Sequence, residues 1–128
     1  MAKTTYSIDG ENFSTLDEFF DEFKSVLTPD YWWGKNLDAF NDVLVGGFGT
    51  PGEDYVLIWK NSKLSKERLG YGETLKELES MLRKCHPTAR SIIAEELRLA
   101  KAQTGPTVFD WIVDAIRKQN PKIDLILE

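Results

Sequence analysis

Residues 55–59 have the sequence Tyr-Val-Leu-Ile-Trp, a continuous apolar run of the kind typical of a strand buried on both faces. Shorter strand patterns lie at the two ends of the chain, around Tyr6 and Ile8 and over residues 123–127. In both segments between these strands, apolar residues recur at helical spacing. Because a parallel crossover needs a long connection, this order predicts an α/β fold with a three-stranded, mainly parallel sheet and helices packed on it.

The helices can be placed by their apolar spacing and their stop signals. The first begins near Ser14, which with Asp17 forms a capping-box-like start, and ends before Pro29. The second runs from about residue 36 to residue 45. Residues 61–104 hold two amphipathic segments separated by Pro87, and a further helix follows. We therefore expect a single domain over residues 1–128 with an extra helical insertion at about 61–104.

Composition excludes several classes of protein. With 128 residues and 41% hydrophobic residues, the chain has the size and make-up of one globular domain. No apolar run approaches the roughly 20 residues of a membrane span, and the N-terminus lacks the apolar core of a signal peptide. The single cysteine, Cys85, and single histidine, His86, exclude a disulfide within the chain and a Cys- or His-rich metal site. We expect a cytoplasmic protein with no membrane association, no metal and no cofactor.

The net charge of −5 is unevenly distributed. Residues 29–54 carry five acids against one lysine, whereas residues 60–104 carry ten bases against six acids. An acidic stretch disfavours binding to a phosphate backbone and suits a basic partner. In the basic stretch the bases alternate with glutamate at helical spacing, which is typical of a solvated, salt-bridged helix surface. The charge pattern therefore favours a basic protein partner and disfavours direct nucleic-acid binding.

Residues 29–48 carry the most informative pattern. Three adjacent aromatic residues, Tyr31, Trp32 and Trp33, lie in a loop bounded by proline and glycine, where aromatic side chains often serve as binding anchors or cover the edge of a core. Downstream, Asp38 and Asp42 are four residues apart, so their carboxylates share one helix face. The expected helix therefore has one acidic face and one apolar face.

Two enzymatic interpretations are weak. Adjacent residues such as Cys85 and His86 rarely place a thiolate and its base correctly, and no orienting third group is evident. Asp38 and Asp42 lack a nearby histidine or third acid for a metal or acid–base role. We expect no catalytic residues.

The segment formed by residues 29–48 resembles the barstar family of ribonuclease inhibitors. The resemblance rests on Gly34-x-Asn36-Leu37-Asp38-Ala39-x-x-Asp42, on the aromatic loop before it, and on the order of strands and helices along the chain. It implies a three-stranded parallel sheet with helices, in agreement with the prediction from periodicity. It also implies a non-enzymatic immunity protein, of the toxin–antitoxin kind, that blocks the basic active site of a ribonuclease or ribonuclease toxin.

The resemblance also implies roles for individual residues. Asp38 and Asp42 correspond to two helix acids of the family that mimic substrate phosphates, and Asp42 corresponds to the one that enters the phosphate pocket. Trp32 and Asn36 correspond to loop contacts, and Gly46 to a contact just after the helix. The other aromatic residues of the loop and Asn41, which is next to Asp42, are added to these. The expected partner-binding residues are Tyr31, Trp32, Trp33, Asn36, Asp38, Asn41, Asp42 and Gly46.

Three departures from the family pattern leave a second hypothesis open. The pattern has tryptophan where this chain has Asn41, an aromatic contact falls at Gly47 or Phe48, and an acid of the last helix falls at Ala115, with Asp114 adjacent. The insertion at 61–104 could lengthen the interface, form a dimer contact or only pack on the sheet. The alternative function is therefore a protein-interaction module on the same fold with a non-nuclease partner.

Overall fold

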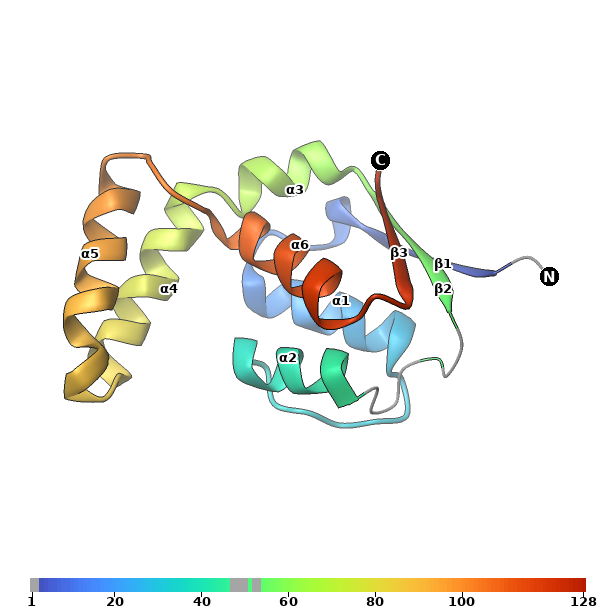
Figure 1. The fold of residues 1–128 in the computed structure, drawn as a ribbon. Coiled ribbons are helices and arrows are strands. Elements are labelled where there is room, and N and C mark those ends of the chain that lie inside the picture. The colour runs from blue at the N-terminus through green and yellow to red at the C-terminus, as the bar shows by residue number, and fades with distance from the viewer. Residues whose placement is uncertain (1–2, 47–50, 52–53) are drawn as a thin grey trace.

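Three parallel strands form the sheet predicted from the sequence. The computed structural model describes residues 3–46, 51 and 54–128. Strands β1 (Thr4–Asp9), β2 (Tyr55–Lys60) and β3 (Ile123–Leu127) lie in the order β1-β2-β3, with β2 in the centre. Ile8 is in register with Trp59, and Trp59 with Leu127. Helices α1 (Leu16–Leu27), α2 (Leu37–Gly46) and α6 (Val108–Gln119) lie together on one side of the sheet (Figure 1).

The one-sided helix layer corrects the prediction that β2 is buried on both faces. Tyr55, Leu57 and Trp59 are buried, whereas Val56 and Ile58 between them are only half-buried. β-Branched residues are favoured in strands for their fit to a pleated, half-buried surface, so they occupy the open face of β2 without being core. The apolar run identified a strand correctly but not the number of its covered faces.

The first helix starts one residue later than predicted. Its N-cap is Thr15, whose hydroxyl accepts a hydrogen bond from the backbone N–H of Glu18 at 3.1 Å. The Glu18 carboxylate in turn accepts from the backbone N–H of Ser14 at 2.8 Å. The start of α1 therefore uses Thr15 as the N-cap and Glu18 as an acceptor for the residue before that cap, instead of the predicted pair Ser14 and Asp17. The C-terminal end is as predicted, because α1 ends at Leu27, before Pro29.

The main core is a cluster of aromatic rings between the sheet and helices α1, α2 and α6. The Phe19 ring stacks on Trp59 of β2 at 5.3 Å between centroids, and meets Phe40 of α2 edge-on at 5.6 Å. Phe109 of α6 closes the cluster against Trp59 at 5.1 Å. Because one cluster joins β2 to three helices, the position of α2 is fixed by the core.

The predicted insertion is helical throughout most of its length. It contains α3 (Ser62–Arg68), α4 (Tyr71–Lys84) and α5 (Arg90–Lys101), and the short helix α3 was not foreseen. Helices α4 and α5 form an antiparallel pair that projects from the body of the molecule (Figure 1). We call this pair the arm. It has a small core of its own, formed by Leu78, Ile93, Leu97 and Ala100.

The base of the arm is joined to the body by two adjacent side chains of α4. The buried carboxylate of Glu73 accepts a hydrogen bond from the N–H of Leu16, the first residue of α1, at 2.7 Å. The hydroxyl of Thr74 accepts from the N–H of Val108, the first residue of α6, at 2.9 Å. N-terminal N–H groups of a helix have no partner within it, so α4 satisfies one such donor on each of two body helices.

Substitution of Glu73 tests this junction. Glu73→Ala is expected to lower the free energy of unfolding by about 2 kcal/mol, because the buried N–H of Leu16 loses its acceptor. The matched control is Glu79→Ala, an exposed position on the same helix, for which a change within about 0.5 kcal/mol is expected. Urea unfolding measures both. Equal effects of the two substitutions would show that Glu73 does not hold the junction.

A second stability prediction concerns alkaline pH. The buried hydroxyl of Tyr55 has no hydrogen-bond partner among the described residues, and burial raises the pKa of Tyr55 to about 12. The folded protein therefore holds this proton more tightly than the unfolded chain, so the stabilisation is complete below pH 10 and is lost as the pH rises toward 12. Relative to Tyr55→Phe, the wild type should lose unfolding free energy between pH 10 and 12. Parallel pH profiles of the two proteins in urea unfolding would contradict this assignment.

Candidate functional site

Helix α2 has the two faces that its sequence predicts. Phe40, Val43 and Leu44 are buried, whereas Asp38 and Asp42 are exposed on the other side. Neither carboxylate makes a hydrogen bond or an ion pair with any other residue in the described part of the chain. Two like charges one turn apart are mildly unfavourable within a helix. The pair is therefore not explained by any contact inside the described structure.

Asn36 and Asp38 also serve the start of α2. The Asn36 side-chain oxygen accepts a hydrogen bond from the N–H of Ala39 at 2.8 Å, which is the geometry of an N-cap. Asp38 lies in the first turn, where a negative charge is stabilised by the helix dipole. Asp42 is a turn further along and gains nothing from the dipole. Of the two acids, Asp42 is the one without a structural role in the helix.

The three aromatic residues of the loop divide into one buried and two exposed side chains. Trp32 is 81% exposed and Tyr31 41%, but Trp33 is only 4% exposed. The indole N–H of Trp33 donates to the Thr28 hydroxyl at 2.9 Å, and its ring packs against Phe20, Phe23 and Phe40. The Trp33 side chain therefore belongs to the core, whereas Tyr31 and Trp32 are exposed to solvent, and the predicted contact role of Trp33 stays a prediction.

Lys24 of α1 fixes the conformation of this loop. Its ammonium group donates to the backbone carbonyl of Trp33 at 3.1 Å. It also lies 5.8 Å from the centroid of the Trp32 ring and 5.4 Å from that of Trp33, within the range of cation–π attraction. The sequence did not predict this role of Lys24, because no local sequence pattern indicates which lysine contacts a loop several residues away. Its contacts therefore join α1 to the loop backbone at Trp33 and to the ring of Trp32.

The remaining predicted residues lie on or beside α2. Asn41 is half-buried next to Asp42, and Gly46 is the exposed last residue of the helix. The predicted aromatic contact at Gly47 or Phe48 lies outside the described residues. On α6, which packs against α2, Ala115 is half-buried against the core and Asp114 is exposed.

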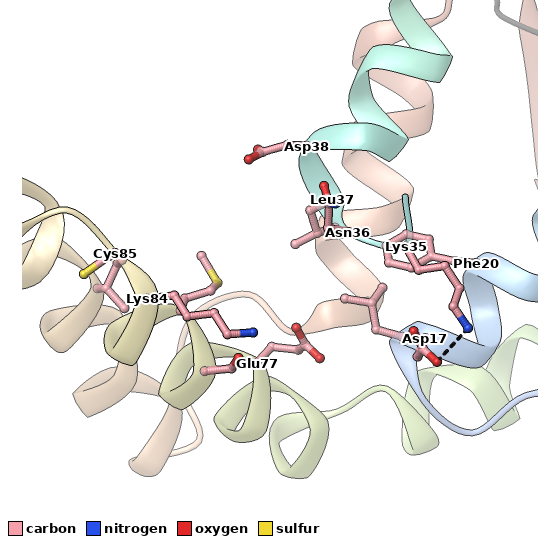
Figure 2. A pocket seen from close by; sticks show the side chains of 13 residues that line it. Asp17, Phe20, Lys35, Asn36, Leu37, Asp38, Glu77, Lys84 and Cys85 are labelled. Carbon is pink, nitrogen blue, oxygen red and sulfur yellow. Dashed lines mark hydrogen bonds and ion pairs between the residues drawn. The ribbon is translucent and has the colours of Figure 1, made fainter. Parts of the chain in front are cut away.

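A cleft that the sequence did not predict opens beside the start of α2. It has a volume of about 520 Å³ and lies between the body and the arm. Figure 2 shows Asp17, Lys35 and Asp38 on the body side and Glu77, Lys84 and Cys85 on the arm side. Asn36 and Asp38 thus belong both to the acidic surface of α2 and to the rim of this cleft.

Neither enzymatic interpretation gains support from the geometry. The Sγ of Cys85 approaches the carbonyl of Leu82 at 3.5 Å, whereas His86 Nδ1 lies 2.9 Å from the Thr88 hydroxyl, so both side chains have other partners. Within residues 3–46, 51 and 54–128, no group of three or more His, Cys, Asp or Glu side chains is arranged to hold a metal ion. In the same part of the chain no helix is both long and apolar enough to cross a membrane.

Comparison with known proteins relates this chain to inhibitors of ribonucleases. Residues 4–95 match the family model described as Barstar (barnase inhibitor). Over 64 residues the chain is 39% identical to Putative ribonuclease inhibitor YrdF of Bacillus subtilis (strain 168). That alignment covers 49% of this chain and 66% of the relative, so the chain spans a little less than two thirds of the relative's length. The family match covers β1, α1, α2 and β2, which include the helix that carries Asp38 and Asp42, and the chain belongs to the barstar family.

Proposed function

We propose that this protein inhibits a ribonuclease by covering its basic active site with the acidic face of α2 and the side chain of Trp32. The observation that carries the proposal is that Asp38 and Asp42 are both exposed on one face of α2. Neither makes an ion pair or hydrogen bond with another described residue. Membership of the barstar family supports the same function.

The chemistry of the surface suits a site built for RNA. An aspartate carboxylate accepts paired hydrogen bonds from an arginine guanidinium, as a phosphate does. Asp42 and Asp38 would therefore occupy phosphate positions in the nuclease cleft. The net charge of −5 would speed encounter with a basic partner, and the association rate should fall as salt is added.

Trp32 supplies the apolar part of the proposed contact. Large aromatic side chains are frequent among the residues that dominate binding energy. Lys24 donates a hydrogen bond to the loop backbone at Trp33 and lies over the Trp32 ring, and these contacts would reduce the conformational freedom lost when Trp32 is covered. Tyr31, Asn36, Asn41 and Gly46 would lie around these contacts.

Such an inhibitor would act as an immunity protein in the cytoplasm, where cellular RNA needs protection from the nuclease. The proposed activity requires no cofactor and no catalytic residue of this chain. Direct binding to nucleic acid is not part of the proposal, because an acidic surface repels phosphate.

Affinity capture from the source cells tests the proposal, with wild-type and Asp42→Ala proteins as parallel baits. After dissociation, each eluate is assayed for RNA cleavage and its proteins are identified by mass spectrometry. We expect a basic protein that is retained by the wild type alone and cleaves RNA once freed. A wild-type partner without nuclease activity would instead favour the interaction-module hypothesis.

A further inference from the structure

The cleft between the arm and the body has features that the acidic surface alone does not explain. Its floor is apolar, with Leu16, Phe20 and Leu37 on the body side and Met81 and Ile93 on the arm side. Its rim is charged. A volume of about 520 Å³ lies within the roughly 300–1,000 Å³ of pockets that enclose whole ligands. The space is therefore large enough for one or two side chains of a partner.

The charges on the rim favour a basic occupant. Lys35 is already engaged by Asp17 and Asp21, at 3.1 and 3.3 Å. This leaves Asp38 and Glu77 as unpaired acids in the described part of the rim, with Lys84 as the one unpaired base there. Burial raises the pKa of Glu77, and the nearby charges of Glu73 and Asp17 raise it further, while Lys84 lowers it. A partner cation would stabilise the ionised carboxylate.

The cleft adjoins the surface proposed to bind the ribonuclease. Asp38 and Asn36 line it and also belong to the surface proposed to cover the nuclease. A protein seated on Asp42 would therefore have its adjoining surface directly over the opening. The arm itself is fixed at its base by Glu73 and Thr74, so the opposite wall is held in place by the fold.

We propose that this cleft receives a second segment of the same ribonuclease, with an apolar side chain against Leu37 and Met81 and a lysine or arginine between Asp38 and Glu77. This inference rests on the proposed function and adds the arm to the inhibitory surface. The insertion at 61–104 would then widen the interface and select nucleases that carry such a segment next to their active site.

Cys85, the one cysteine of the chain, lines the cleft and can report its occupancy. Purified barnase, related bacterial ribonucleases and the ribonuclease recovered by capture are first tested for inhibition by the wild type. The first of them that is inhibited is used to form the complex. Alkylation of Cys85 by iodoacetamide is followed by mass spectrometry of its peptide, in the free protein and in the complex. We expect alkylation to slow at least about tenfold in the complex. In the control variant Lys101→Cys/Cys85→Ser, which places the thiol at an exposed position outside the cleft, the alkylation rate should be the same in the free protein and in the complex.

Charge reversal on α4 provides the second readout. Glu77→Lys should raise the dissociation constant at least about tenfold, which is the effect of losing one favourable charge contact. Glu79→Lys makes the same change in net charge at an exposed position outside the cleft, and less than about a threefold effect is expected. Glu77→Gln, with a smaller effect in the same direction, replaces Glu77→Lys if that variant fails to fold in a thermal melt.

The outcomes separate the two proposals. Inhibition by the wild type, combined with unchanged Cys85 alkylation or with equal effects of Glu77→Lys and Glu79→Lys, would overturn the cleft proposal and leave the proposed function standing. Failure of the wild type to inhibit any of the ribonucleases would contradict the proposed function, and the cleft proposal with it.

Discussion

Asp42→Ala is expected to weaken the complex with the target ribonuclease by about 2–5 kcal/mol, which corresponds to roughly 30-fold to several thousandfold in the dissociation constant. In the proposed complex the Asp42 carboxylate neutralises basic side chains that are removed from water. Truncating it would leave those charges buried without a partner. Since Asp42 has no described contact within the chain, the free energy of unfolding should change by less than about 0.5 kcal/mol.

Asp124→Ala is the matched control for this substitution. Asp124 is an exposed aspartate of β3, on the sheet face that helices α1, α2 and α6 leave open. Its removal makes the same change in net charge away from the acidic surface, and it should slow association slightly without a large change in affinity. Isothermal titration calorimetry with the ribonuclease measures both variants. Similar affinities for Asp42→Ala and Asp124→Ala would place the interface elsewhere.

Phe40→Ala is expected to give the largest loss of stability, about 3–5 kcal/mol in the free energy of unfolding. The ring is 0% exposed and lies 5.0 Å from Phe23, 5.6 Å from Phe19 and Phe20, and 6.0 Å from Trp33, measured between centroids. Its removal opens a cavity between α1 and α2. The control Val45→Ala lies on the same helix but is 65% exposed, and a change within about 0.5 kcal/mol is expected.

This substitution also links the core to the acidic surface. Phe40 lies on the face of α2 opposite Asp38 and Asp42, so the aromatic cluster sets the position of both carboxylates. Urea unfolding gives the stability, and amide hydrogen exchange shows whether α2 loses protection before the sheet does. A loss of less than about 1 kcal/mol would mean that the surrounding rings collapse into the space, and that α2 is held in some other way.

The sequence predicts most of the fold because its periodic segments agree with their surroundings. The apolar spacing in α1, α2 and α6 and the three short strand patterns gave the element order and the parallel sheet. The two faces of α2 also followed from the sequence, since residues four apart share a helix face. Asp38 and Asp42 could therefore be recognised as an exposed pair without a structure.

Features that depend on contacts between distant segments could not be predicted in this way. In a loop no period indicates which side chain points inward, so nothing distinguished buried Trp33 from exposed Trp32. The contacts of Lys24 with that loop have no local signature either. The cleft joins residues near position 37 to residues near position 80, and it depends on the contacts of the arm with the body, among them the hydrogen bonds of Glu73 and Thr74.

The most direct test of the proposed function is the inhibition of the captured ribonuclease at increasing concentrations of its RNA substrate. If α2 and Trp32 occupy the active site, the inhibitor and RNA exclude each other, and the apparent inhibition constant should rise linearly with RNA concentration. Asp42→Ala should require far more protein at every RNA concentration, whereas Asp124→Ala should follow the wild type. Inhibition that does not depend on RNA concentration, or that Asp42→Ala retains in full, would contradict active-site blockade by this surface.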